Sequence, residues 1–361
     1  MKVLVWDLDN TLWQGTLLED GEVRLPDELR TVVADLDSRG ILQSIASKND
    51  HDLAWPQLEK LGVAEYFVLP QIGWGPKSVS VRRIADRLGF AQQTVAFIDD
   101  LPAERAEVAF HLPEVRCYDA ADAATLTLLP EFTPATVTED SAQRRLMYQA
   151  GVRRDTARKD FVGPDEEFLR SLRIETAIVR ATGAQLARVA ELTVRTSQMN
   201  ATGVHYSEAD LQGLLADPRH EVLVVTMADR FGSHGAVGIV LLEKHPRLWH
   251  LKLLATSCRV VQFGAGSVLL RWLIDQAARA AVHLAADFRR TERNRIMEVA
   301  YRFAGFTDQL CACLDHLSAR QVDSEQAGIQ LLHVEPSPQP APGAMRLAAP
   351  ELTTMDGLCH V

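Results

Sequence analysis

The stretch VLVWDLDNT, residues 3–11, decides the fold that we expect for the first part of the chain. Its first four residues are apolar, a run typical of a buried strand in a parallel sheet. Two carboxylates, Asp7 and Asp9, follow at once. Ligands of open α/β sheets bind at the carboxyl edge of the strands, so this acidic turn is a candidate site. Taken alone, an acid-rich turn after a strand is equally well explained as a structural turn.

The pattern of strand and helix continues to about residue 120. We expect further strands at 41–47, 66–71 and 94–100, and helices at 26–39, 54–61 and 77–88. A glycine follows each of these helices, which is a common C-terminal signal. Alternation of this kind predicts a parallel sheet with helices on both faces.

Polar residues stand at the ends of the later strands. Ser47 ends the second strand, Lys77 opens a helix after a Gly-rich turn, and Asp99 and Asp100 end the fourth strand, with Glu104 beyond them. A serine hydroxyl and a lysine could hold and neutralise a phosphoryl group. Each residue also has a structural explanation, as a helix cap or a solvated charge, but their joint occurrence favours a site.

Composition excludes several classes of function. Lys and Arg number 38 against 48 Asp and Glu, a formal charge of −10, which disfavours sequence-independent binding of nucleic acid. A local basic pocket for a small anion stays possible. Five unevenly spaced cysteines do not predict a disulfide framework. With no signal-peptide pattern and no apolar run of about 20 residues, we expect a cytoplasmic protein without a membrane segment or a nucleic-acid partner.

Two domains are expected from the length of 361 residues and from the change of pattern along the chain. The first covers residues 1–130, and a charged stretch at 131–167 is expected to be a linker or a connecting helix. The second covers 168–334, with strands at 221–229, 234–244, 248–258 and 281–288. The Pro- and Ala-rich residues 335–361 are expected to form a flexible tail.

A cysteine at the end of a strand marks the second domain. Cys258 is followed by Arg259, by a Gly-rich turn at 264–266 and by a helix. The positive charge of Arg259 and the dipole of the helix favour the thiolate form of Cys258. The alternative is a buried structural cysteine. Cys311 and Cys313 flank a single alanine, too close for the usual zinc pair, and we expect them to be packing residues.

The acids, the serine and the lysine of the first 120 residues, in their order along the chain, resemble the pattern of the haloacid dehalogenase (HAD) superfamily. That resemblance implies that Asp7 is a nucleophile that accepts a phosphoryl group, while Asp9 protonates the leaving oxygen and later activates water. It also implies Mg²⁺, held by Asp7, by the backbone of Asp9 and by an acid of the Asp99–Asp100 pair. Asp100 is the preferred ligand because Asp99 is expected to point back toward its strand.

Residues 168–334 resemble the GCN5-related N-acetyltransferase (GNAT) fold, which usually binds the pantetheine arm of coenzyme A. The resemblance rests on the glycine turn and on the spacing of Asn294, Tyr301 and Gly305. One position departs from the pattern, because Val261 stands where Gln or Arg is usual. The fold class expected for the whole chain is therefore α/β, a HAD-like Rossmannoid parallel-sheet domain followed by a GNAT-like α+β domain.

The combination resembles the FkbH-like family, through the strings DLDNTLW, SIASKND, FIDDLPAER, RTSQMNATGVHYSEADL and SCRV. That family makes glyceryl-acyl carrier protein from 1,3-bisphosphoglycerate. The string RTSQMNATGVHYS resembles most the members that supply methoxymalonyl extender units for polyketides, and members that feed tetronates or lactate-type starters stay an alternative. The resemblance implies that Cys258 takes the acyl group and passes it to a phosphopantetheinylated acyl carrier protein. Asn200, Thr202 and His205 would line the acyl site, unless they form a capped turn between two helices.

Three alternatives stay open at this point. The chain could be a stand-alone Mg²⁺-dependent HAD phosphatase of a small phosphorylated metabolite. It could be an N-acyltransferase that binds coenzyme A and carries a degenerate phosphatase module. It could also be a non-catalytic docking protein for carrier domains, although the complete set of acids, serine and lysine argues against this.

Overall fold

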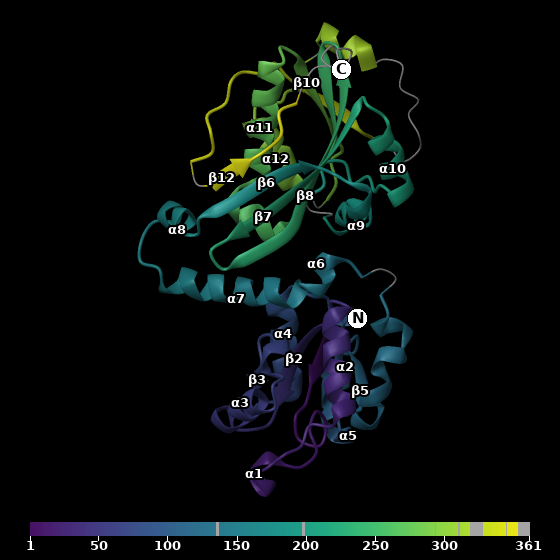
Figure 1. Ribbon diagram of the computed structural model, residues 1–361, viewed down its shortest axis with the longest axis vertical. Helices are drawn as coiled ribbons and strands as arrows, with labels where there is room; N and C mark the ends of the chain where they lie inside the picture. Colours follow the sequence, from purple (N-terminus) through teal and green to yellow (C-terminus); the bar gives the residue numbers. More distant parts are fainter. Residues whose placement is uncertain are drawn as a thin grey trace. The chain divides into compact units, whose positions relative to one another are not determined.

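The computed structural model describes residues 1–134, 137–196, 199–292, 294–309, 311–317, 328–343 and 345–352. The side chains of residues 139, 140, 195, 258 and 316 lie outside this description. The chain forms two compact units, Met1–Asp160 and Phe161–Val361 (Figure 1). In the described part of the chain, no helix combines the length and the apolar character needed to cross a bilayer.

The first unit contains a five-stranded parallel sheet in the order β3-β2-β1-β4-β5. Its strands are β1 (Val3–Trp6), β2 (Leu42–Ser47), β3 (Gln71–Ile72), β4 (Val95–Asp99) and β5 (Arg116–Asp119). Every residue of β1 is buried, because a strand lies on each side of it and helices cover both faces. The apolar run that opens the chain is thus the centre of the sheet.

Helices cover both faces of this sheet, as the alternating pattern predicts. Trp6 of β1 packs in one apolar cluster with residues of α2 and α3, whereas Val5 packs in another with residues of α4 and α5. The α-helices of the unit are α1 (Leu17–Asp20), α2 (Asp27–Ser38), α3 (His51–Lys60), α4 (Lys77–Leu88), α5 (Pro102–His111), α6 (Glu139–Ala142) and α7 (Arg144–Asp160). Short 3₁₀ helices lie at Ala64–Tyr66, Gln92–Thr94, Ala120–Leu128 and Pro130–Phe132.

The charged stretch at 131–167 contains a connecting helix, one of the two forms expected for it. Phe132 is fully buried in a core cluster of the first unit. On α7, Met147 and Ala150 are buried and Arg145 forms an ion pair with Asp37 of α2. This stretch therefore belongs to the first unit as far as Asp160. Some of its charges lie inside the packing, since Arg154 is buried and Arg145 is largely covered.

The second unit contains a seven-stranded mixed sheet in the order β11-β10-β9-β8-β7-β6-β12. Neighbours are antiparallel except for the pairs β9–β10 and β6–β12, which are parallel. Its strands are β6 (Ile174–Arg180), β7 (His220–Asp229), β8 (Gly232–His245), β9 (Leu248–Thr256), β10 (His283–Phe288), β11 (Gln330–Val334) and β12 (Met345–Ala348).

Helices of the second unit pack against this sheet, and along the chain they alternate with its strands (Figure 1). They are α8 (Asp165–Ser171), α9 (Leu186–Arg195), α10 (Glu208–Ala216), α11 (Ala265–Arg279) and α12 (Arg295–Phe303). The 3₁₀ helices lie at Gly183–Gln185, Cys258–Phe263 and Ala312–Leu317. The predicted fold class, a parallel-sheet α/β domain followed by an α+β domain, is confirmed.

The expected flexible tail at 335–361 needs correction in its described part. Met345–Ala348 form β12, which pairs in parallel with β6, and the backbone N–H of Leu352 donates to Oε1 of Gln276. The Pro- and Ala-rich composition predicted disorder for the whole segment. Four residues suffice for β12, however, because β6 offers an edge of backbone donors and acceptors to pair with. Residues 353–361 lie outside the described chain.

Candidate functional site

Sheet topology places two of the predicted acids beside each other. The strand order changes direction at β1, since β2 lies on one side of it and β4 on the other. At such a switch point the connections leave in opposite directions and open a crevice at the carboxyl ends of the strands. Asp7 follows β1 and Asp99 ends β4, and both are buried. The position of both acids is therefore a direct result of the topology.

Lys77 lies between these two carboxylates. Its Nζ atom is 2.5 Å from Oδ1 of Asp7 and 2.6 Å from Oδ2 of Asp99. The lysine side chain is only 4% exposed, although it opens helix α4. The second oxygen of Asp99 accepts a hydrogen bond from the backbone N–H of Leu101 at 2.8 Å. Two buried carboxylates and one ammonium leave a net negative charge in the crevice.

The pKa values reflect this shortage of positive charge. Burial raises the pKa of Asp7 to about 6, and the charge of Asp99 adds to the effect while Lys77 opposes it. The pKa of Asp100 is also raised, by burial first and then by Asp99. Burial acts to lower the pKa of Lys77, but the two carboxylates outweigh it and raise that pKa. The site would be stabilised by a further cation.

The acids fit Mg²⁺ in number and chemistry. One carboxylate oxygen from each of Asp7, Asp99 and Asp100 lies within 4.8 Å of the others. Carboxylate oxygens are the ligands that Mg²⁺ prefers. The turn that carries the pair is fixed, because Arg105 donates to both of its carbonyl oxygens and the N–H of Asp100 donates to Thr11. The expectation that Asp99 points back toward its strand was wrong, because its carboxylate contacts Lys77 beside Asp7. Lys77 and the N–H of Leu101 already bind the two oxygens of Asp99, so Asp100 stays the preferred ligand.

Asp9 lies apart from the three clustered acids. Its Oδ1 atom accepts hydrogen bonds from Nε1 of Trp13 and from the N–H of Leu17, at 2.8 and 3.0 Å. Its Oδ2 atom accepts one from Nδ2 of Asn49 at 2.9 Å. Asn10, in the left-handed conformation with φ 53°, makes the tight turn after Asp9. The sequence analysis missed Asn49, although it stands two residues beyond Ser47.

Ser47 ends β2 at the same edge of the sheet and is buried. An open hollow of about 450 Å³ adjoins this edge. Lys48 and Glu104 form an ion pair at its wall, with 2.5 Å between Nζ and Oε1. The residues that line the hollow are Lys48, Trp74, Pro76, Ala103, Glu104 and Glu107. Asp7, Asp99 and Asp100 are not among these residues, so the hollow adjoins the edge of the sheet without exposing the clustered acids.

Replacing Lys77 with methionine is expected to destabilise the protein strongly without metal. The change leaves Asp7 and Asp99 buried side by side with no cation, which costs about 3–5 kcal/mol in comparable buried pairs. Urea unfolding in EDTA would measure this loss, and added Mg²⁺ should restore part of it. Exposed Lys60 gives the control variant Lys60→Met. Equal stability of the Lys77 and Lys60 variants would contradict a buried charge cluster.

Strands β9 and β10 of the second unit separate part-way along their length. They pair from Leu248 to Leu251 of β9, whereas β9 itself continues to Thr256. Beyond this point the backbone of β9 faces a new neighbour. The two strands separate at the C-terminal end of β9, the end that leads to Cys258.

A short piece of chain, Met199–Ala201, occupies this separation, and we name it the inserted segment. The N–H of Ala201 donates to the carbonyl of Leu254, and the N–H of Thr256 donates to the carbonyl of Met199, at 3.1 and 3.0 Å. On its other side the N–H of Arg289, which follows β10, donates to the carbonyl of Ala201. The second half of β9 is thus hydrogen-bonded on both sides.

The polar residues expected in the acyl site help to hold this segment. Asn200 is fully buried, and its amide donates to the carbonyls of Thr193 and Val204 while accepting from the N–H groups of Thr202 and Gly203. This geometry favours the alternative of a capped turn for Asn200 and Thr202. Asn294 donates to the carbonyls of the inserted segment.

His205 is exposed and lies beyond this turn. Its backbone follows Val204, whose carbonyl is the acceptor for Asn200. Its exposed position leaves the histidine available to a ligand, but nothing in the turn depends on it.

Cys258 is the first residue of the 3₁₀ helix Cys258–Phe263, two residues after the end of β9, and its side chain lies outside the described residues. Arg259 is turned back toward the strand end, because its N–H and its Nε both approach Oγ of Ser257, at 3.4 and 3.2 Å. Gly264, with φ 73°, ends this 3₁₀ helix and allows α11 to begin. The cysteine thus precedes a tight turn into a helix.

A buried histidine packs against the same 3₁₀ helix, and the sequence analysis missed it. The ring of His234 lies edge-on to Phe263, with 5.3 Å between ring centroids. Its Nε2 atom is 3.1 Å from Oδ2 of buried Asp229, across the turn between β7 and β8. A histidine oriented by a carboxylate is the arrangement of a general base. An aspartate and a histidine on either side of a Gly-containing hairpin turn were the available signal.

Tyr301 of α12 is fully buried near the end of β10. Its ring packs edge-on against Phe288 and Phe306, with centroid distances of 6.1 and 5.1 Å. Within the described part of the chain its hydroxyl has no hydrogen-bond partner. Burial therefore raises the pKa of this tyrosine, and the hydroxyl stays protonated.

The comparisons with known proteins give matches to solved structures alone. A scan against protein-family models finds no matching family, and a search of curated proteins finds no match. One similar structure is the N-terminal part of protein BF1531 from Bacteroides fragilis, which contains a phosphatase domain complexed with Mg. It is 28% identical over 37% of this chain and 41% of its own length, with a TM-score of 0.35. The match therefore spans less than half of that protein.

The other similar structures are of a different kind. The ribosomal-protein-S18-alanine N-acetyltransferase of Escherichia coli is 15% identical over 46% of this chain and 97% of its own, with a TM-score of 0.32. Tetrahymena GCN5 is 14% identical over 46% of this chain and 99% of its own, with a TM-score of 0.34. Parts of this chain are thus similar to a phosphatase domain and to acetyltransferases.

Proposed function

We propose that this chain moves a glyceryl group from 1,3-bisphosphoglycerate to the phosphopantetheine thiol of an acyl carrier protein, as a step toward methoxymalonyl extender units. Its first unit would be a Mg²⁺-dependent phosphatase and its second an acyltransferase. The observation that carries the proposal is Lys77 held between Asp7 and Asp99 at the switch point of the sheet, with Asp100 beside them.

The phosphatase step would use the acids of the first unit. An oxygen of Asp7 attacks phosphorus of the C3 phosphate, the bond from phosphorus to the C3 oxygen breaks, and Asp9 gives that oxygen its proton. Water then attacks the aspartyl-phosphate and gives a proton to Asp9, which releases inorganic phosphate. Lys77 offsets the charge of the phosphoryl oxygens, and Ser47 lies at the same edge to bind one of them.

Mg²⁺ would be held by Asp7, by Asp100 and by the backbone of Asp9. When bound, the ion neutralises charge on the phosphoryl oxygens during transfer. The raised pKa values of Asp7 and Asp100 support this assignment, because a nearby dication would favour both carboxylates.

The transfer step would use the second unit. The thiolate of Cys258 attacks the C1 carbonyl, and the bond from C1 to the acyl-phosphate oxygen breaks. The pantetheine thiol then attacks this thioester, gives its proton to His234, and Cys258 leaves as a thiolate. One thioester replaces another, so the exchange needs no other energy source. Support comes from the position of Cys258 at the end of β9 and of the His234–Asp229 pair against the same 3₁₀ helix.

The inserted segment restricts where a pantetheine arm can approach β9. In the GNAT-like interpretation an acyl thioester lies beside the strand that corresponds to β9. Here the second half of β9 is hydrogen-bonded on both sides, by β8 and by Met199–Ala201. A thioester would instead approach the end of the strand, at Ser257–Arg259. The segment does not separate a carrier-bound thiol from coenzyme A, because both have this arm. Val261, which stands where Gln or Arg is usual, weakens binding of the coenzyme A pyrophosphate, which a carrier-bound arm lacks, so the N-acyltransferase alternative is the weaker one.

Intact-protein mass spectrometry would test the proposal directly. The protein is mixed with Mg²⁺ and 1,3-bisphosphoglycerate, first alone and then with a phosphopantetheinylated acyl carrier protein. We expect a glyceryl adduct on the chain that moves to the carrier. A phosphoglyceryl adduct would mean that acyl transfer precedes removal of the C3 phosphate. Phosphate release without added mass on either protein would favour the stand-alone phosphatase and reject the transfer.

His234→Gln should slow transfer to the carrier by about 10²–10⁴-fold, the usual contribution of a general base. Phosphate release by the first unit should stay unchanged, because His234 belongs to the second unit. The rate of carrier loading, followed by mass over a pH series, is the measurement. His111→Gln changes an exposed histidine and is the control. Equal loading rates for both variants would remove His234 from the proposed chemistry.

A further inference from the structure

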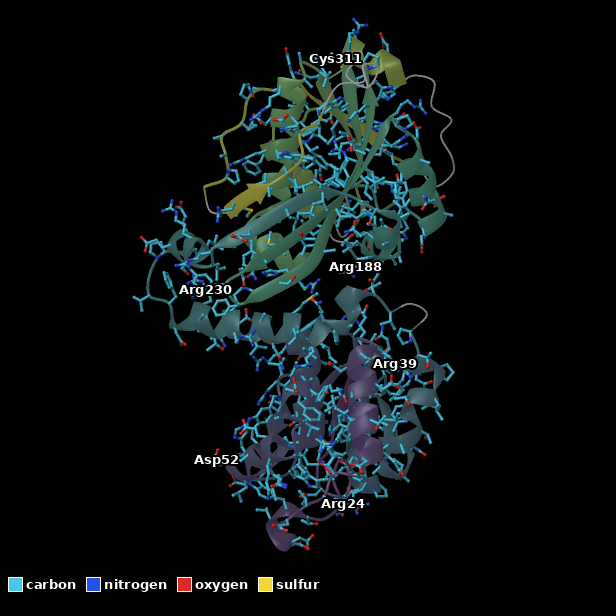
Figure 2. All side chains as sticks on the ribbon, viewed as in Figure 1. Arg24, Arg39, Asp52, Arg188, Arg230 and Cys311 are labelled. Carbon is cyan, nitrogen blue, oxygen red and sulfur yellow. The ribbon has the colours of Figure 1, made fainter. Side chains whose placement is uncertain are left out.

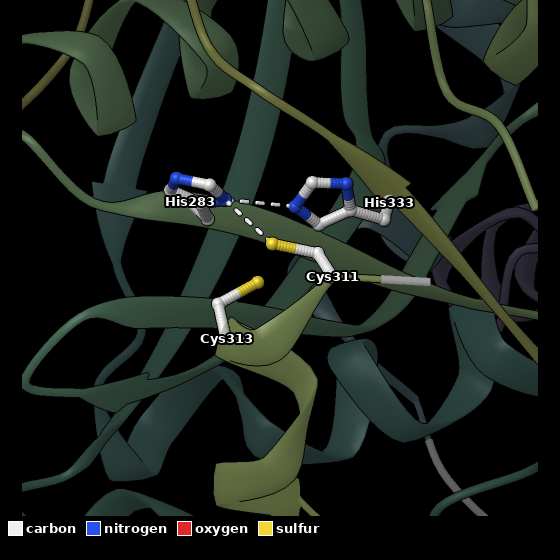
Figure 3. Close-up of side chains that lie close together, drawn as sticks. All are labelled: His283, Cys311, Cys313 and His333. Carbon is white, nitrogen blue, oxygen red and sulfur yellow. Dashed lines mark hydrogen bonds between the residues drawn. The ribbon is translucent and has the colours of Figure 1, made fainter. Parts of the chain in front are cut away.

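Four side chains with metal-binding atoms meet at one end of the second sheet. They are His283 at the start of β10, His333 of β11, and Cys311 and Cys313 at the start of the 3₁₀ helix Ala312–Leu317 (Figure 3). One ligand atom from each lies within 4.8 Å of all the others. The expectation that the cysteines are packing residues was incomplete, since folding brings two histidines to them.

The distances suit a small four-coordinate ion. Nδ1 of His283 is 2.9 Å from Nε2 of His333 and 3.5 Å from Sγ of Cys311. In a tetrahedral zinc site with Zn–N of about 2.0–2.1 Å and Zn–S of about 2.3 Å, neighbouring ligand atoms are roughly 3.3–3.8 Å apart. Figure 3 shows the two sulfur atoms and the facing ring nitrogens directed toward a common centre. Small shifts of the side chains would bring all four to one ion.

The donor set selects the metal. Two thiols and two imidazoles are soft and borderline ligands, typical of zinc and unlike the carboxylate set of the first unit. Without a metal, a thiolate on either cysteine would repel a thiolate on the other, and a protonated ring of either histidine would repel a protonated ring of the other. A dication among them would favour two thiolates and two neutral rings.

The cluster lies far from the proposed chemistry. His283 is paired with Leu248, the first residue of β9, whereas Cys258 lies two residues beyond the last residue, Thr256. A strand of this length separates its ends by roughly 25 Å. Figure 2 agrees, because Cys311 lies at the opposite end of the second unit from Arg230, the neighbour of Asp229. A metal here would not take part in acyl transfer.

The local core is small, which gives a metal a structural role. The apolar cluster beside the four side chains contains three buried residues, Leu248, Ala285 and Leu317. Cys313 packs against it. Among the described residues, few buried apolar groups therefore hold the segment that carries both cysteines, and a bound ion would add cross-links there.

We propose that His283, Cys311, Cys313 and His333 form a structural site for one Zn²⁺ ion. Four protein ligands leave no position open for substrate, as in structural zinc sites. Binding displaces two thiol protons to solvent and needs no oxidant or reductant. The ion would tie the 3₁₀ helix Ala312–Leu317 to strands β10 and β11.

Metal analysis of the full-length protein would test the site. Protein purified without chelator should contain about one zinc per chain by inductively coupled plasma mass spectrometry. The double variant Cys311→Ser/Cys313→Ser should lose that zinc, while Cys117→Ser, which changes a half-buried cysteine of the first unit, should keep it. Asp7→Asn should also keep it, which separates this site from the acids of the first unit. Zinc content that is unaffected by the cysteine changes would overturn the proposal.

A second measurement avoids dependence on how the variant folds. The unaltered protein is stripped with a chelator and refilled with Co²⁺. Two thiolate ligands should give an intense sulfur-to-cobalt band in the near ultraviolet together with the visible bands of tetrahedral Co²⁺. Absence of the sulfur band, or a Cys311–Cys313 disulfide in freshly purified protein by peptide mass mapping, would overturn the proposal.

Discussion

An Asp7→Asn variant should release the C3 phosphate at least about 10⁴-fold more slowly than the unaltered protein, because a neutral amide cannot replace the nucleophilic carboxylate. Free phosphate would be measured with 1,3-bisphosphoglycerate and Mg²⁺ in the Cys258→Ala background, which removes the C1 phosphate displaced by Cys258, after subtraction of the spontaneous hydrolysis of the acyl phosphate. Asp86→Asn, an exposed change on α4, is the control. A variant at position 7 that releases phosphate normally would exclude Asp7 as the nucleophile.

The same variant should be more stable than the unaltered protein when metal is absent. Between pH 4 and 6 the folded protein binds more protons at Asp7 than the unfolded chain does, because its pKa is raised from 3.8 to about 6. The free energy of unfolding therefore falls as pH rises through this window. At pH 7 the cost is at most about 3 kcal/mol, at 1.36 kcal/mol per pKa unit.

Urea unfolding in EDTA would measure this difference at pH 4 and pH 7. We expect the Asp7→Asn variant to gain stability over the unaltered protein at pH 7 and much less at pH 4. The opposite order would mean that Asp7 is retained for its ion pair with Lys77. Loss of activity together with a gain of stability is the pattern of a residue kept for function.

Cys258→Ala should abolish the acyl-enzyme and reduce loading of the carrier protein to the uncatalysed rate. The variant keeps a small side chain at the first residue of the 3₁₀ helix, so the turn into α11 should persist. Intact mass after reaction with 1,3-bisphosphoglycerate is the measurement, and removal of the C3 phosphate should continue. This last point separates transfer from the phosphatase chemistry of the first unit.

The matched control is Cys117→Ala. Burial raises the pKa of the Cys117 thiol to about 11, so it is a poor nucleophile at neutral pH. This variant should load the carrier normally. If the Cys258→Ala variant still forms an acyl-enzyme, another residue is the nucleophile. If that variant loads the carrier without forming an acyl-enzyme, the acyl group passes directly to the pantetheine thiol.

The first site could be predicted well from the sequence because its geometry follows from topology. Carboxyl ends of parallel strands meet at one edge, so residues that follow β1, β2 and β4 come together wherever a parallel sheet forms. Lys77 adds to them from the start of α4. The direction of the Asp9 carboxylate, toward Trp13 and Asn49, depends on hydrogen bonds that no strand pattern encodes.

The second unit was less predictable because its sites depend on long-range contacts. His283 lies 28 residues before Cys311 and 50 before His333, so no spacing motif joins them. The inserted segment occupies the separation of β9 and β10 through backbone atoms alone, and backbone contacts leave no mark on residue type. Strand β5, with the sequence RCYD, lacks the apolar run of the other strands and was also missed.

Strand β12 has a consequence for how the protein is made. The chain must be complete to Met345 before β6 acquires its outer neighbour, and Thr176 of β6 and Met345 are 169 residues apart. At a ribosomal speed of about 5–20 residues per second, β6 would stand with one bare edge for roughly 8–34 s. During that interval a nascent chain could pair with another through this edge. Slow synthesis or early termination should therefore promote aggregation of unfinished chains.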